Sequence, residues 1–135
     1  MDNTRIVRFL VLTVWLSALP GCGGGPAPSG DAMISSEELA SRLQSDTAPL
    51  ILDVRTSGEY ASGHIPGAVH IPHTQISRRI GEFDGYRDAE IVVYCTSGPR
   101  AYSAEAVLKR AGFERVRHLA GDITRWRREG RPISR

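Results

Sequence analysis

The sequence predicts an α/β fold in which helices cover both faces of a small, mainly parallel β-sheet. Short apolar runs, suited to buried strands, alternate along the chain with segments of helical composition. Strands that alternate with helices in this way form parallel sheets covered on both faces. At 135 residues the chain has room for one domain of ordinary size.

The predicted elements follow one another in a regular order. Ser35 and Glu38 have the spacing of a capping box, so we expect a helix to begin there and to continue through Leu39 and Leu43, before Pro49. The predicted strands are 50–54, 68–71, 91–94 and 116–119. The other predicted helical segments are one or two turns at 57–63, a weak helix at 76–83, a longer helix at 100–112 and a last one around 123–126.

The first 22 residues differ from the rest of the chain. Arg5 and Arg8 precede an apolar run of 11 residues, 9–19, which is too short to span a bilayer and fits the core of a secretion signal. The following sequence, Leu19-Pro-Gly-Cys22, resembles the lipobox of bacterial lipoproteins, in which the cysteine is lipidated and becomes the first mature residue. An ordinary signal peptide or an uncleaved anchor is the alternative.

This resemblance implies an exported protein of the bacterial cell envelope, held to a membrane by acyl chains on Cys22. We expect a signal peptide at 1–21, a lipid-anchored flexible tether at 22–30 and the folded domain at 31–135, because 23–30 contains mainly glycine and proline. The net charge of +2 gives no reason to expect nucleic-acid binding.

Cys95 stands where the strand 91–94 ends and the next helix begins. Such a loop offers backbone N–H groups without helical partners and a partial positive charge, which favour anions and the thiolate form of cysteine. Thr96 and Ser97 add hydroxyl donors, and Arg100 adds a planar cation. The loop alone is equally compatible with a nucleophile and with an inert, buried cysteine.

Three segments together resemble a single rhodanese (sulfurtransferase) domain over residues 35–133. LDVR, EY and GHIPGA within 52–68 resemble the amino-terminal signature of the family, and YCTSGPR at 94–100 resembles its six-residue active-site loop, which starts with cysteine. Leu-Ala-Gly at 119–121, followed by Trp126, resembles the closing segment. The family more often has a second glycine at position 122, and we do not expect Asp122 to touch the chemistry.

The resemblance implies roles for individual residues. Cys95 matches the nucleophile, which accepts a sulfane sulfur and becomes a persulfide. Asp53 and Arg55 match residues that we interpret as supports of the site. The residues that match the loop around the sulfur are Thr96, Ser97, Gly98, Pro99 and Arg100.

The implied reaction is a double displacement without a cofactor. Sulfur moves from a small donor such as thiosulfate to a thiophilic acceptor such as cyanide or a thiol. We expect the protein to act as a monomer.

Two other functions stay open. A module with the same fold that only carries or senses sulfur would need the same thiolate. A cysteine phosphatase or arsenate reductase is less favoured, because that class resembles C-x5-R, whereas Arg100 comes one position earlier here.

The remaining polar clusters give weaker indications. His64, His70 and His73 fit no helix face and have no accompanying carboxylates, so we expect no metal site. A run of basic residues near the carboxyl end is typical of a solvated helix face, with contact to anionic lipid headgroups as the alternative. These residues are Arg125, Arg127, Arg128, Arg131 and Arg135.

Overall fold

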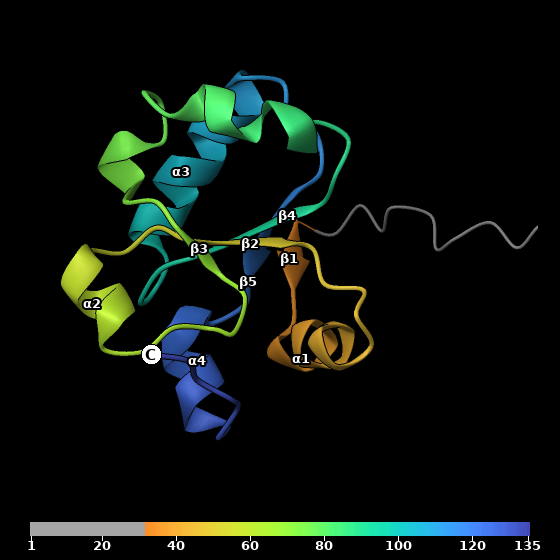
Figure 1. Cartoon of the computed structure of the whole chain (residues 1–135), viewed down its shortest axis with the longest axis vertical. Helices are drawn as coiled ribbons and strands as arrows, with labels where there is room; N and C mark the ends of the chain where they lie inside the picture. The colour runs from red at the N-terminus through yellow and green to blue at the C-terminus, as the bar shows by residue number, and fades with distance from the viewer. Residues whose placement is uncertain (1–31) are drawn as a thin grey trace, which may run out of the picture.

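A parallel sheet forms the centre of the structure, which is a computed structural model describing residues 32–135 (Figure 1). Its five strands are arranged in the order β1-β5-β4-β2-β3, and every pair of neighbours is parallel. The strands are β1 (Met33–Ile34), β2 (Leu50–Asp53), β3 (Val69–His70), β4 (Ile91–Tyr94) and β5 (Val116–Leu119). The predicted signal peptide and tether lie outside the described residues.

The central strand, β4, is buried along its whole length. Its side chains alternate between the two faces of the sheet, as the pleat of a strand requires. Ile91 and Val93 belong to the apolar cluster on one face, and Val92 and Tyr94 belong to the cluster on the other. The β-branched run is therefore explained by a strand that needs an apolar side chain at every position.

Helices cover both faces of the sheet, which confirms the predicted fold class (Figure 1). On one face, α3 (Pro99–Arg110) packs on the sheet with the 3-10 helices η1 (His73–Gln75) and η2 (Ile80–Tyr86). On the other face lie α1 (Ser36–Gln44) and α4 (Asp122–Arg128), which contribute Leu39 and Trp126 to the core.

The short helix α2 (Ser57–Ala61) connects β2 to β3. Thr56 and Glu59 form a full capping box at its start, a pattern that the sequence analysis did not single out. The end of the chain returns to this region, where Ser134 forms a bridge with His64. Residues 32–135 hold no helix of the length and apolarity needed to cross a membrane.

Two elements differ from the prediction. The strand β1 has only two residues, too few to show a periodic pattern, and it was not predicted. The segment expected to form a weak helix at 76–83 contains 3-10 turns instead, with η2 at Ile80–Tyr86. Gly81 and Gly85 both lie within η2, and glycine disfavours a regular α-helix.

Candidate active site

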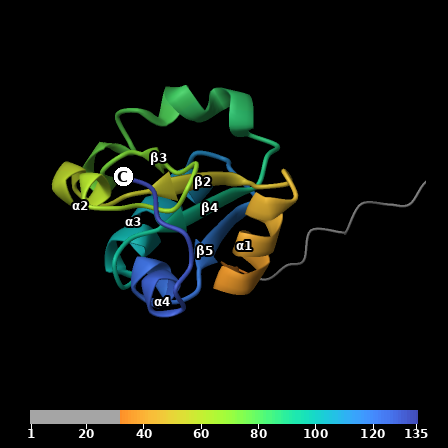
Figure 2. The same ribbon diagram turned by 60° about the horizontal axis from the view of Figure 1, so that its bottom comes forward.

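Cys95 lies at the carboxyl edge of the sheet, directly after β4. Figure 2 shows β2, β4 and β5 side by side, and their register pairs Asp53 with Tyr94 and Val93 with His118. Parallel sheets bind ligands beyond the carboxyl ends of their strands. The structure therefore places the predicted loop, 95–100, where such a sheet offers a binding site.

The sulfur of Cys95 receives a hydrogen bond from its own loop. The backbone N–H of Gly98 donates to Sγ over 3.1 Å. Gly98 has a φ of +124°, and a Cβ atom there would lie 3.3 Å from the ring of Tyr102, so this turn requires glycine. The helix α3 begins at the next residue, Pro99, and the amino-terminal end of a helix carries a partial positive charge that attracts anions.

An ion pair attaches this loop to α2. Arg100 donates two hydrogen bonds to the carboxylate of Glu59, over 2.7 and 2.9 Å, and a third to the hydroxyl of Thr96. Thr96 in turn donates to Glu59 over 3.0 Å. Hydrogen bonding to Arg100, which outweighs partial burial, lowers the pKa of the Glu59 carboxyl far below its usual range. Sequence reasoning quoted Glu59 in a signature but gave it no role in the site.

The start of α4 supports the loop from the other side. The hydroxyl of Thr124 donates to the carbonyl of Thr96 over 2.7 Å, and the N–H of Ile123 donates to the carbonyl of Cys95 over 3.2 Å. Ser97 is exposed, whereas Cys95 retains only 1% of its accessible surface. The loop therefore presents Ser97 to solvent and encloses the sulfur.

Asp53 and Arg55 form a buried ion pair beside β4. Arg55 Nη2 lies 2.5 Å from Asp53 Oδ2 and donates to the carbonyl of Gly63 over 2.9 Å. Tyr94 donates to Asp53 over 2.7 Å and accepts from the N–H of Ile65 over 3.1 Å. Burial and the Asp53 carboxylate raise the pKa of Tyr94, which keeps its hydroxyl neutral. These contacts join β2, β4 and the turn at 63–65.

Asp122 contacts the backbone of the candidate nucleophile, a contact that the sequence analysis did not anticipate. The N–H of Cys95 donates to Asp122 Oδ1 over 2.8 Å. The physical reason is the sheet order: β5 lies next to β4, so the first residue of α4 reaches the end of β4. A sequence alone does not show which strands are neighbours, so this contact was missed.

Two of the three histidines considered for a metal site pack on an aromatic ring. His64 and His70 stack on Tyr60, with ring centroids 3.8 and 4.7 Å apart. A ring nitrogen of His64 also lies 3.1 Å from the carbonyl of Tyr60. Within residues 32–135, no three histidine, cysteine or acidic side chains gather in a way that could hold a metal ion.

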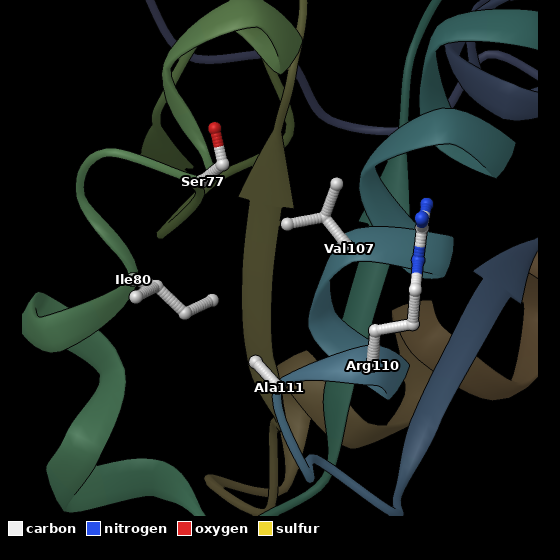
Figure 3. A pocket seen from close by; sticks show the side chains of 5 residues that line it. All are labelled: Ser77, Ile80, Val107, Arg110 and Ala111. Atoms are coloured by element: carbon white, nitrogen blue, oxygen red, sulfur yellow. The ribbon is translucent and has the colours of Figure 1, made fainter.

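A surface pocket of about 350 Å³ lies away from this site. Figure 3 shows Ser77 and Ile80 on one side of it and side chains of α3 on the other. These residues are Val107 and Arg110 of α3 and Ala111, which follows the helix directly. They lie at the carboxyl-terminal end of the helix, whereas Cys95 lies at its amino-terminal end, so this pocket is separate from the candidate active site.

The fold and the loop define an α/β domain with a buried cysteine at the junction of a strand and a helix. The comparison with known families makes the class specific, because the rhodanese-like domain matches residues 35–129. The chain therefore belongs to the rhodanese-like domain family.

Individual relatives support this assignment. A sulfurtransferase from Allochromatium vinosum is 42% identical over 100 residues, which cover 74% of this chain and 92% of the relative. A Bacillus subtilis protein, YrkF, provisionally named a sulfur carrier, is 37% identical over 69% of this chain, which spans only 49% of that protein. The solution structure of a rhodanese-like domain from an Anabaena protein has a TM-score of 0.69 and 30% identity, and the match covers 77% of this chain and 79% of that domain.

Proposed function

We propose that this protein is a sulfurtransferase that moves a sulfane sulfur from a small donor to a thiophilic acceptor through a persulfide on Cys95. The observation that carries the proposal is the hydrogen bond from the N–H of Gly98 to Sγ, at the positive end of α3. A donor aimed at sulfur stabilises negative charge there, and both the attacking thiolate and the persulfide carry that charge.

The proposed reaction has two displacements. The Cys95 thiolate attacks the outer sulfur of thiosulfate, the S–S bond of thiosulfate breaks, and sulfite leaves with the bonding electron pair. Cyanide or a thiolate then attacks the outer sulfur of the persulfide, forms thiocyanate or a new persulfide, and returns Cys95 as the thiolate. Neither step needs an external oxidant or reductant.

The geometry of Arg100 favours sulfur over phosphate as the transferred group. A phosphatase loop needs its arginine to bind the phosphate oxygens with both arms of the guanidinium. Here both arms of Arg100 are bonded to Glu59, with Nη1 and Nη2 at 2.7 and 2.9 Å from its carboxylate oxygens. Arg100 therefore acts as a brace of the loop and as a source of positive charge near Cys95.

A carrier that accepts sulfur but does not turn it over is the second candidate. The similarity to the provisionally named carrier YrkF is the observation that favours it. The two functions differ in the second displacement, since both begin with the same persulfide.

Steady-state turnover with thiosulfate and cyanide tests the proposal. We expect continued thiocyanate formation by the wild type and none by Cys95→Ser. Ser41→Ala is the matched control, because Ser41 is exposed on α1 and lies outside the cysteine loop. Persulfide formation without turnover would favour the carrier. Phosphate ester hydrolysis without sulfur transfer would contradict both.

We also propose that the protein is exported and anchored to a membrane through a lipid on Cys22. The support is the order of charge, apolar run and cysteine in residues 1–22. Cell fractionation and mass spectrometry should find an acylated, membrane-associated form that Cys22→Ala abolishes. A soluble wild-type form without acyl chains would contradict this proposal.

A further inference from the structure

A chain of buried charged side chains leads from the backbone of Cys95 into the interior. Asp122 uses Oδ1 to accept from the Cys95 N–H, and its Oδ2 lies 3.1 Å from Nε2 of His118. The other ring nitrogen of His118, Nδ1, lies 2.6 Å from Oε1 of Glu105. The three side chains are between 2% and 6% exposed. The proposed sulfur-transfer chemistry assigns no role to His118 or Glu105.

His118 is positively charged at neutral pH. Burial disfavours the charged ring, but hydrogen bonds to Asp122 and Glu105 and their negative charges outweigh burial and raise the pKa of His118 to about 9. Both ring nitrogens then donate, one to each carboxylate.

The surroundings of His118 supply these two carboxylates and one nearby cation. From α3, the ring of Tyr102 stacks on His118 at a centroid distance of 4.3 Å, and Lys109 lies 3.7 Å from Glu105. The residues beside His118 on the neighbouring strands are Met33 and Val93, and neither titrates.

This arrangement solves an electrostatic problem at the nucleophile. A carboxylate that holds the amide of Cys95 also brings negative charge close to the sulfur, and a like charge disfavours a thiolate. The imidazolium of His118, bonded to the far oxygen of Asp122, offsets that charge. The backbone of Asp122 has a φ of +51°, a left-handed conformation that most residues other than glycine avoid.

We propose that Asp122 and His118 are positioning residues for sulfur transfer. Asp122 fixes the amide of Cys95, and His118 neutralises Asp122, so that the loop is held without a net negative charge beside the reacting sulfur. The role in transfer rests on the proposed function. The effect on the reactivity of the Cys95 sulfur is independent of the proposed function, because that reactivity is measured without a sulfur donor.

The test measures the alkylation of Cys95 by iodoacetamide in the full chain, read from the tryptic peptide 88–100 by mass spectrometry. We expect His118→Gln to slow alkylation at pH 7 by about tenfold, which corresponds to about 1.4 kcal/mol in the activation free energy. The deficit should shrink as the pH rises past 9, because His118 then loses its charge in the wild type as well. His73→Gln, a matched change on η1, should leave the pH profile unchanged.

A double variant separates charge from shape. Asp122→Asn keeps an oxygen that can accept from the Cys95 N–H and removes the negative charge. Added to His118→Gln, it should return alkylation at pH 7 to within about threefold of the wild type. A merely structural role of His118 predicts a further loss in the double variant, which would overturn the proposal. A folded His118→Gln with the wild-type pH profile would overturn it too.

If His118→Gln does not fold, Asp122→Gly carries the test. Glycine accepts the φ of +51° but removes the acceptor of the Cys95 N–H. We expect its kcat for thiosulfate-dependent transfer to fall about tenfold while alkylation at pH 7 is at least as fast as in the wild type. Unchanged transfer would overturn the proposal. A wild type that forms no persulfide would instead contradict the proposed function. The alkylation profiles would still show whether His118 offsets the negative charge of Asp122 beside the Cys95 sulfur.

Discussion

Arg100 and Glu59 are 41 residues apart in the sequence, yet two hydrogen bonds of 2.7 and 2.9 Å join their side chains. This pair connects the cysteine loop to α2, whose first turn Glu59 also caps through the N–H of Thr56. One carboxylate therefore fixes both the short helix and the loop that carries the nucleophile.

Removing this carboxylate should loosen the loop. We expect Glu59→Gln to lower kcat/KM for thiosulfate-dependent sulfur transfer by about tenfold, equivalent to about 1.4 kcal/mol of transition-state stabilisation. The matched control is Glu82→Gln, which breaks a similar pair with Arg79 on the exposed surface of η2. An equal loss in both variants would contradict a specific role of Glu59 in bracing the loop.

The turn at Gly98 should tolerate no side chain. Gly98→Ala places a Cβ atom at a φ of +124° and 3.3 Å from Tyr102, a backbone strain on the order of 1–3 kcal/mol. We expect the loop to relieve this strain by turning the N–H away from Sγ. We expect sulfur transfer to fall by at least tenfold. Gly58→Ala is the control, since a Cβ atom at Gly58 meets nothing within 4 Å, and helix propensity favours alanine there. Full activity in Gly98→Ala would show that the Gly98 turn is not required.

The buried pair beside β4 should contribute to stability. Asp53→Asn leaves the guanidinium of Arg55 buried without its counter-charge, and we expect a loss of about 3 kcal/mol in the free energy of unfolding. Urea denaturation measures it. Asp84→Asn, which breaks an exposed pair with Arg87, should change stability by less than about 0.5 kcal/mol. Similar small changes in both variants would contradict the assignment of Asp53 as a structural support.

His118 should make stability depend on pH in the alkaline range. Its pKa rises from an ordinary value of about 6.5 in the unfolded chain to about 9 in the folded one. The stabilisation is therefore fully present below about pH 6.5 and is lost as the pH rises through 9, a change of about 3 kcal/mol. The difference in unfolding free energy between wild type and His118→Gln should shrink across this range. A constant difference would contradict the raised pKa.

The features that were predicted from the sequence are local ones. The run 91–94 is apolar at every position and therefore predicts a buried strand by itself. The loop after it contains a recognisable helix start at Pro99. The family signatures are also contiguous in the sequence. For this reason the fold class and the position of Cys95 could be predicted without a structure.

The features that were missed depend on which elements are neighbours. The contact between Cys95 and Asp122 joins residues that are 27 apart, and it exists because β5 lies beside β4. In the sequence, His118 is only one residue of a short predicted strand. The packing of α3 against that strand brings Glu105 to His118. No sequence spacing distinguishes such a buried carboxylate from an ordinary surface residue of a helix.

The central claim is that Cys95 carries sulfur, and mass spectrometry of the protein incubated with thiosulfate tests it most directly. We expect the tryptic peptide 88–100 to gain one sulfur atom in the wild type, to lose it on addition of cyanide with formation of thiocyanate, and to gain none in Cys95→Ser. A folded wild-type protein whose Cys95 peptide keeps its original mass in the presence of thiosulfate would contradict the claim.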